Sequence, residues 1–257
     1  MEKIIIDKEK IKEELIEKNL FSLQKDLIKQ RRRRILVMSL LLFSFALTII
    51  YGTLENPFKY TLSKIGNYFT YRWVFIVWAM VTGFAIQIAI LVLFHVEEYK
   101  AKHPYIYNSL SAIFLTATAI IPSLSKIYPF WHFIHTLLTV FYAISVFLSI
   151  NPFVIWVGKN NPRLRFFLNI WLCVIWIGSL FPIILFGKTG MFELWFFLTL
   201  IIFLLYLSLV LFEGKIVKMS VAFLKNEQDL NIAIEKIYVN LEKDYELNPF
   251  RKKKKSD

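Results

Sequence analysis

The chain has 257 residues, is 57% hydrophobic and carries a net charge of +12, from 31 Lys and Arg against 19 Asp and Glu. A soluble domain is usually about 45–50% apolar, so this composition argues against an ordinary soluble enzyme. The 25 Phe, 12 Tyr and 7 Trp exclude an intrinsically disordered chain, because they supply ample apolar surface to bury.

The charges divide the chain into three segments. Residues 1–34 hold 11 basic and 7 acidic side chains, and residues 213–257 hold 10 and 8. The 178 residues between them, 35–212, hold only 14 charged side chains. We therefore expect a membrane domain over 35–212 between two charged cytoplasmic segments, 1–34 and 213–257.

The N-terminal segment has the spacing of an amphipathic helix. Ile16, Leu20, Leu23 and Leu27 recur every three or four residues, which places them on one helix face. The basic run Arg31–Arg34 follows and indicates a topology determinant or a contact with anionic lipid headgroups.

Six apolar stretches follow, each close to the roughly 20 residues that a membrane-spanning helix needs. None carries a charged residue deep inside, where a charge would cost a few kcal/mol. They lack both the polar face of a helix buried in a soluble core and the alternation of a β-barrel strand. We expect an all-α polytopic membrane protein, a six-transmembrane-helix bundle with amphipathic cytoplasmic N- and C-terminal helices. Its spans are approximately Ile35–Tyr51, Trp73–His95, Tyr105–Ile121, Phe130–Ile150, Leu164–Phe186 and Met191–Phe212.

Basic residues near the ends of the spans predict the orientation. Fourteen Lys and Arg flank one side of the six spans and five flank the other. Because cytoplasmic loops carry the basic excess, we expect a multi-pass protein of the cell membrane with both termini in the cytoplasm. The first 34 residues are too polar for a cleavable signal peptide, and the single Cys173 provides no multi-thiolate metal site.

Polar groups of both signs gather on the non-cytoplasmic side. In the fourth span, a stripe that includes His135, Thr139 and Tyr142 lies within an arc of about 100° on the helix. The outer loops and the start of the sixth span add further polar residues. The candidate ligand-binding residues are Glu55, Ser63, Lys64, Asn67, Arg72, Ser123, Lys126, His132, His135 and Glu193.

Several kinds of chemistry are open to this set. An anionic headgroup needs a cation and hydrogen-bonding groups, such as Arg72, Lys64 and Ser63. A lipid-modifying hydrolase or transferase would use Ser63 or Ser123 as nucleophile, with either histidine as base. A metal site would need nearly every His and Glu of this side, so we expect no metal and no cofactor. The same residues could instead be interfacial anchors, because aromatic and basic side chains commonly lie at headgroup level.

Polar residues inside the spans leave a transporter, or the substrate-binding subunit of one, as another alternative. Ala79, Gly83 and Gln87 repeat at a four-residue step on the second span. Small residues mark close helix contacts in lipid, so the simpler interpretation is a packing seam with Gln87 hydrogen-bonded across helices.

The C-terminal segment repeats the amphipathic spacing of the N-terminal one. Leu230, Ile234, Ile237 and Leu241 share a helix face, and Lys252–Lys255 follow near the end. Much of the basic excess flanks the spans, so we expect anionic membrane lipids at the cytoplasmic face and no nucleic acid. A membrane-protein partner is also compatible with these terminal helices.

The stretch Thr61-Leu62-Ser63-Lys64-Ile65-Gly66-Asn67 resembles the Ser-x-x-Gly loop of an uncharacterised family of six-helix prokaryotic membrane proteins, itself loosely similar to FRAG/DRAM/Sfk-type proteins. Ile121-Pro122 before the fourth span, which His132 or His135 opens, matches the same pattern. The resemblance covers roughly 35–212 and implies a six-helix bundle with cytoplasmic termini. It implies no assigned activity, although some eukaryotic relatives are linked to lipid remodelling. We therefore expect an integral membrane protein that binds a lipid headgroup or small ligand at its outer face.

Overall fold

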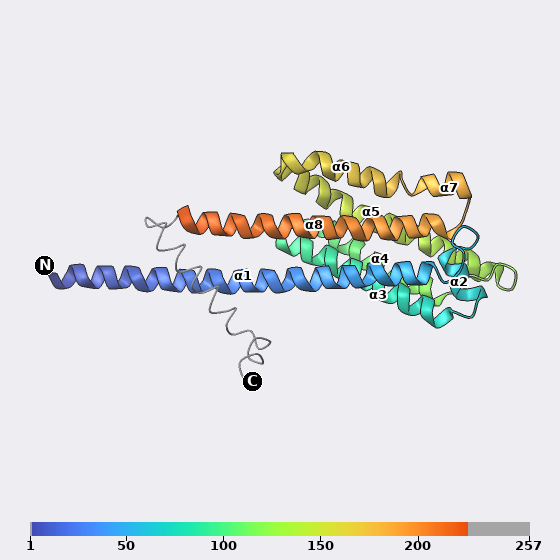
Figure 1. Ribbon diagram of the computed structural model, residues 1–257, viewed down its shortest axis with the longest axis horizontal. Coiled ribbons are helices and arrows are strands. Elements are labelled where there is room, and N and C mark those ends of the chain that lie inside the picture. Colours follow the sequence, from blue (N-terminus) through green and yellow to red (C-terminus); the bar gives the residue numbers. More distant parts are fainter. Residues whose placement is uncertain (1, 226–257) are drawn as a thin grey trace, which may run out of the picture. The chain divides into compact units, whose positions relative to one another are not determined.

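The computed structural model describes the backbone of residues 2–225 and the side chains of residues 21, 22 and 24–218. This part of the chain is helical and contains no strand, which confirms the all-α prediction (Figure 1). The helices are α1 (Glu2–Gly52), α2 (Leu62–Tyr68), α3 (Arg72–Val96), α4 (Lys102–Ile120), α5 (Pro129–Asn160), α6 (Pro162–Trp176), α7 (Leu180–Phe186) and α8 (Gly190–Lys225).

The chain divides into two compact units. The larger one, Arg33–Leu211, contains α2 to α7 and most of the apolar residues of α1 and α8. In the other unit, the structure describes only helical segments, which are residues 2–32 of α1 and residues 212–225 of α8. The predicted amphipathic face at Leu230–Leu241 and the run Lys252–Lys255 lie outside the described residues. The same holds for the side chains of Ile16, Leu20 and Leu23 on the N-terminal face.

Five helical stretches of the described chain are long and apolar enough to cross a membrane. They are Gln24–Gly52, Arg72–Val96, Pro129–Asn160, Pro162–Phe186 and Gly190–Lys218. The predicted third span falls on α4, which is helical over 19 residues but is not one of the five. Its hydropathy is lower because its first turn carries Lys102 and His103 and because it contains Asn108 and Ser111, which are buried within the protein.

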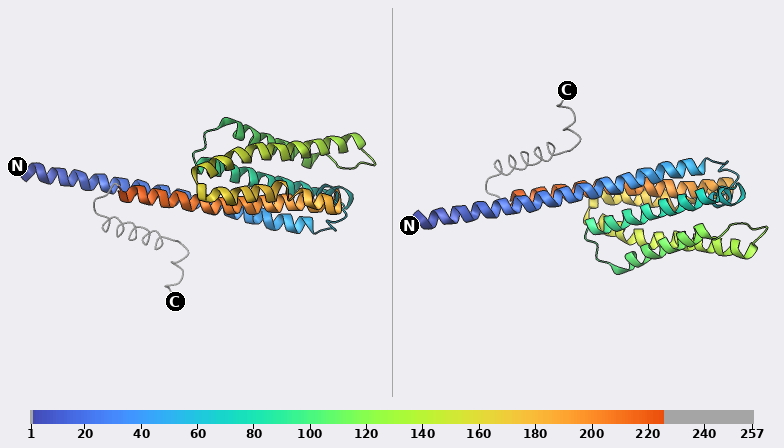
Figure 2. Two further views of the ribbon diagram at one scale, coloured as in Figure 1. Left: turned by 90° about the horizontal axis from the view of Figure 1, so that it is seen from above. Right: turned by 90° about the horizontal axis from the view of Figure 1, so that it is seen from below.

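Neighbouring helices of the larger unit pack against one another in chain order. Helix α4 packs against both α3 and α5, α5 also packs against α6, and α2 packs against α3 (Figure 2). A side chain at Gly83 of α3 would overlap the side chain of Leu115 on α4, so the absence of a Cβ permits this approach. The small-residue step predicted on the second span is therefore part of a helix–helix contact.

An aromatic cluster joins three helices that are distant in sequence. The Trp78 ring of α3 is buried, stacks on Tyr51 of α1 with 4.8 Å between ring centroids, and meets the edge of Phe197 of α8 at 5.2 Å. Its indole Nε1 donates a hydrogen bond to Thr48 Oγ1 on α1 at 3.1 Å. Aromatic pairs of this geometry add about 0.5–1.5 kcal/mol beyond their buried area, so the cluster fixes α1, α3 and α8 in register.

The fifth predicted span is broken into α6 and α7. The amide of Gly178 bonds to Cys173 O, five residues earlier, and the amide of Leu180 bonds to Ile177 O, three residues earlier. Pro182 explains the position of the break, because it has no N–H for the carbonyl one turn earlier and its ring clashes there. The bypassed carbonyl of Val174 accepts instead from Trp195 Nε1 of α8 at 3.1 Å.

Residues 62–68, which the sequence predicts as part of an outer loop, instead form the short helix α2. Thr61 caps this short helix through its hydroxyl, which accepts a hydrogen bond from Lys64 N at 3.3 Å. Leu62 and Ile65 are almost fully buried and hold it against the bundle. A capping residue followed by apolar residues three apart is the local signal for such a turn of helix.

Candidate functional site

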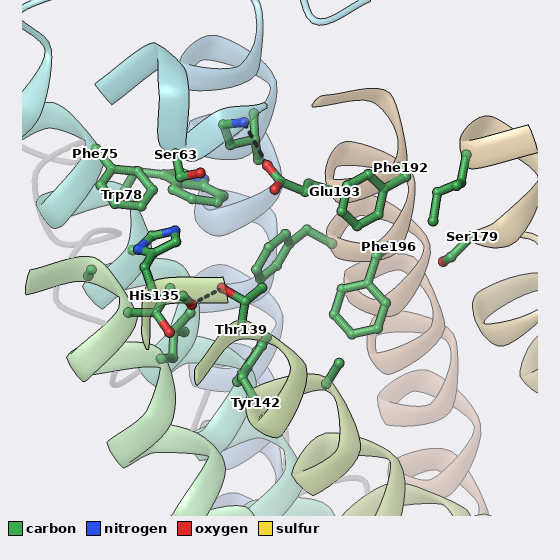
Figure 3. Close-up of a pocket in the computed structure, with 18 of the residues that line it drawn as sticks. Ser63, Phe75, Trp78, His135, Thr139, Tyr142, Ser179, Phe192, Glu193 and Phe196 are labelled. Carbon is green, nitrogen blue, oxygen red and sulfur yellow. Dashed lines mark hydrogen bonds between the residues drawn. The ribbon is translucent and has the colours of Figure 1, made fainter. Parts of the chain in front are cut away.

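A pocket of about 240 Å³ lies in the larger unit, at the end of the bundle that carries α2 (Figure 3). We call this end the α2 end; the α2–α3, α4–α5 and α7–α8 connections also lie there (Figure 1). A dry apolar cavity of about 150 Å³ already admits benzene, and small-molecule pockets begin near 300 Å³. The polar residues among the lining are Ser63, Thr118, His135, Thr139, Tyr142, Ser179 and Glu193.

The rest of the wall is apolar. Trp78 comes from α3, Leu115 from α4, Trp176 and Ile183 from the α6–α7 segment, and Phe196 from α8. These helices bring together residues separated by more than 100 positions in the sequence. The predicted polar stripe of the fourth span accounts for His135, Thr139 and Tyr142, which follow one another down α5 along the pocket.

Glu193 in the first turn of α8 supplies the carboxylate of the pocket (Figure 3). Its Oε2 accepts a hydrogen bond from the amide of Leu62, the first residue of α2, at 2.6 Å. Among the described residues, no hydrogen bond reaches its second oxygen and no Lys or Arg forms an ion pair with it. Lys64 and Lys188 act on this carboxylate electrostatically from outside the pocket lining.

His135 ties α5 to the end of α4. The side chain is 4% exposed, and its Nδ1 bonds to the carbonyl of Ile121 at 3.0 Å. A carbonyl oxygen can only accept, so Nδ1 carries a hydrogen. The ring also points from α5 toward Ser63 on α2 (Figure 3), but no hydrogen bond joins the two side chains in the described part of the chain.

Three hydroxyl groups of the pocket already donate to their own helices. Thr118, Thr139 and Ser179 each donate to the carbonyl four residues earlier, on α4, on α5 and at the α6–α7 break. Such a hydroxyl has used its single hydrogen, and only its lone pairs face a bound molecule. The wall of the pocket is therefore richer in hydrogen-bond acceptors than in donors.

Among the described residues that line the pocket, Tyr142 has a buried hydroxyl without a hydrogen-bond partner. Its side chain is 2% exposed, and Oη makes no hydrogen bond to any described residue. A buried polar group that lacks a partner costs about 1–3 kcal/mol. The side chain of Tyr142 lines the pocket, but its oxygen is buried away from a molecule there in this structure.

Arg72 and Asn67 belong to the architecture of the α2 end. Arg72 Nη1 donates to Asn67 Oδ1 at 2.7 Å, and Asn67 Nδ2 donates to Ser63 O at 2.6 Å. The other terminal nitrogen of Arg72 donates to the carbonyl of Ile120, at the end of α4. Both residues were candidates for ligand binding, but neither lines the pocket, and their polar atoms connect α2, α3 and α4.

Ser123 and His132 form the serine–histidine pair of this end. Ser123 Oγ lies 3.0 Å from His132 Nδ1, whereas the hydroxyl of Ser63 lies 3.3 Å from that of Thr61. Ser123 is buried, which leaves a substrate carbonyl no access to its oxygen in this structure. The arrangement thus provides a hydrogen bond across the α4–α5 connection and no exposed nucleophile.

The other candidates surround the pocket without lining it. Glu55 lies in the α1–α2 connection and is half-buried, Lys64 on α2 is also half-buried, and Lys126 is exposed in the α4–α5 connection. Of the ten candidates, Ser63, His135 and Glu193 line the pocket.

Sequence reasoning did not include the side wall formed by Trp176, Ser179, Ile183 and Phe192. The local signal for this wall is Pro182, because a proline within a membrane helix frees backbone groups that then need protein or solvent contacts.

No protein-family model, curated protein or solved structure matches the chain. Within the residues that the structure describes, no three His, Cys, Asp or Glu side chains are grouped so that they could hold a metal ion.

Proposed function

We propose that this chain is a polytopic protein of the cell membrane that binds a lipid or a lipid-like small molecule in the pocket at its α2 end. The observation that carries the proposal is an apolar cavity of about 240 Å³ with a carboxylate and an unpartnered tyrosine hydroxyl in its wall. Ionisable residues within membrane spans are rare, and they usually mark a functional site. Exposed apolar residues cover the α6–α7 segment, including Phe181 and Ile184, so a ligand could reach this side of the pocket from the bilayer.

A sixth membrane crossing by α4 is part of this proposal. The α3–α4 connection leaves the end of α3 that is remote from α2, and α5 begins again at the α2 end. Helix α4 must therefore run back along the bundle, and its 19 residues give a length of about 29 Å, close to the hydrocarbon thickness of about 30 Å. Six crossings place both termini on one side of the membrane.

The excess of basic residues supports a cytoplasmic location for that side. The connections and helix ends opposite to α2 carry Lys100, Lys102, Lys159, Arg163 and Arg165. The positive-inside bias then makes the α2 end the outer face. The charged segments 1–34 and 213–257 would meet anionic lipid at the cytoplasmic surface.

Cysteine labelling tests this topology. In a Cys173→Ser background, Lys64→Cys should react with a membrane-impermeant maleimide added to intact cells, and Lys100→Cys should react only after the cells are permeabilised. The opposite pattern would place the pocket at the cytoplasmic face.

A pocket-filling substitution tests the binding proposal. Ala143 lines the pocket, so Ala143→Phe should reduce the lipid that co-purifies with the full chain, measured by native mass spectrometry. Ala46→Phe is the matched control, because Ala46 is exposed on α1 and does not line the pocket. Equal lipid content in the unchanged protein and in both variants would count against the proposal.

Transport is the second candidate function. Buried amide groups of Gln87 on α3 and Asn108 on α4 have atoms without a partner among the described residues. These atoms favour a polar passage deeper in the bundle, but neither residue lines the pocket. A transporter would lose substrate uptake, and not only ligand binding, when Gln87 is replaced by Leu.

A further inference from the structure

The hydrogen-bond donors and acceptors in the pocket wall indicate which kind of head group the pocket binds. We infer that the pocket binds an apolar molecule with an uncharged hydroxyl head, a long-chain, isoprenoid or ring alcohol, whose hydroxyl donates to Glu193. This inference rests on the proposed function and specifies its ligand class.

The acceptor-rich wall is the first argument. Thr118, Thr139 and Ser179 have already donated their hydroxyl hydrogens to backbone carbonyls. Glu193 retains one carboxylate oxygen that no described residue bonds, and no Lys or Arg lines the pocket. A carboxylate or phosphate head would place its negative oxygens against these acceptors without a cation to pair with, so the wall disfavours an anionic head.

The charges around the pocket provide the second argument. Lys64 and Lys188 act electrostatically on Glu193, although neither lines the pocket. A cationic head would be attracted by the Glu193 carboxylate and repelled by both lysines, and it would also lose its hydration on entering a largely apolar pocket, which is costly for an ion. A hydroxyl carries no net charge, donates one hydrogen to the free carboxylate oxygen, and can accept one hydrogen bond in return.

The depth of the pocket provides the third argument. His135 near its polar end and Tyr142 lie seven residues apart on one face of α5, which corresponds to about 10 Å along the helix. Between and around them the wall is formed by Trp78, Phe196 and other apolar side chains (Figure 3). This shape accommodates an elongated, mostly apolar ligand body.

Quenching of tryptophan fluorescence can compare head groups, because Trp78 and Trp176 line the pocket. The full chain is reconstituted in phosphatidylcholine bilayers and titrated with four terminally brominated probes: dodecanol, its methyl ether, dodecanoate and dodecylamine. Affinities are compared at equal mole fraction in the bilayer. We expect the alcohol to bind about two- to tenfold more tightly than the ether, which cannot donate, since a net hydrogen bond contributes about that factor. The carboxylate and the amine should also bind more weakly than the alcohol.

Glu193→Gln should reduce the preference for the alcohol over the ether, while keeping an oxygen that can accept from Leu62 N. Glu55→Gln is the matched control in the same end of the bundle and should leave the preference unchanged. Because the comparison of probes uses the unchanged protein, it stands even if Glu193→Gln fails to fold.

The possible outcomes distinguish failure of the hydroxyl-head inference from failure of the proposed lipid-binding function. Equal affinity for alcohol and ether, or tighter binding of the carboxylate or the amine, overturns the hydroxyl head and leaves pocket binding intact. If Ala143→Phe abolishes quenching by every probe, the pocket is the site. If no probe quenches the unchanged protein in a saturable way, the proposed function itself fails.

Discussion

Arg72 can either stabilise the fold of the α2 end or bind a lipid headgroup, and its substitution distinguishes these two roles. Arg72 donates to Asn67 Oδ1 at 2.7 Å and to the carbonyl of Ile120, so it joins the start of α3 to α2 and to the end of α4. Hydrogen bonds from a charged donor contribute about 1.5–3 kcal/mol each when buried. The side chain is half-buried, and solvent screening reduces this contribution. We therefore expect Arg72→Ala to lower the free energy of unfolding by about 2 kcal/mol.

Arg72→Lys should lose about half of that stability, because an ammonium group keeps the charge but lacks the planar fork that reaches both partners. The measurement is reversible unfolding in mixed micelles with increasing dodecyl sulfate, followed by circular dichroism. Lys64→Ala is the control, since Lys64 is a cation of the same end whose side chain makes no hydrogen bond or ion pair to the described residues; it should change stability by less than about 0.5 kcal/mol. Equal stability of Arg72→Ala and Lys64→Ala would refute the architectural role. A selective loss of co-purifying lipid from Arg72→Ala would then favour headgroup binding.

Two further predictions concern helix contacts. Gly83→Ala should destabilise the protein by about 1–2 kcal/mol, because the new methyl group meets Leu115, whereas Gly214→Ala faces open space and should be neutral or stabilising by up to about 1 kcal/mol; equal effects in the same unfolding titration would contradict this packing. Trp195→Phe leaves the carbonyl of Val174 without its donor. This change should destabilise the α6–α7 segment by about 1 kcal/mol and speed hydrogen exchange of nearby amides. Unchanged hydrogen exchange of these amides would show that the Trp195 indole does not stabilise the break.

The membrane character of the chain follows from composition and charge distribution alone. A hydrocarbon environment forces every spanning backbone to satisfy its own hydrogen bonds, so long uncharged apolar stretches have few alternatives to helix. For this reason the predicted spans at Trp73–His95 and Phe130–Ile150 lie within α3 and α5. The stripe on α5 could also be read from the sequence, because a helical period places His135, Thr139 and Tyr142 on one side.

Helix breaks and short helices depended on longer-range contacts. Pro182 indicated a kink, but the backbone pattern from Cys173 to Leu180 also requires Trp195 of α8 to satisfy a freed carbonyl. The Thr61 cap and the apolar pair Leu62 and Ile65 are a local signal for α2, but burial of these two side chains against the bundle holds the short helix in place. Neither partner is near in sequence, so local pattern could not supply them.

The residue types at the α2 end can be read from the sequence, but the partners of these residues depend on the tertiary fold. Arg72 and Glu193 looked alike from the sequence, as charged residues at the start of an apolar helix. In the fold, both terminal nitrogens of Arg72 are used by neighbouring helices, whereas Glu193 keeps one oxygen free and lines the pocket. The difference arises because a hydrogen bond depends on distance and direction between atoms that the chain brings together only on folding. The charge distribution along the chain is therefore readable from the sequence, whereas the hydrogen-bonding partners that line the pocket depend on the fold.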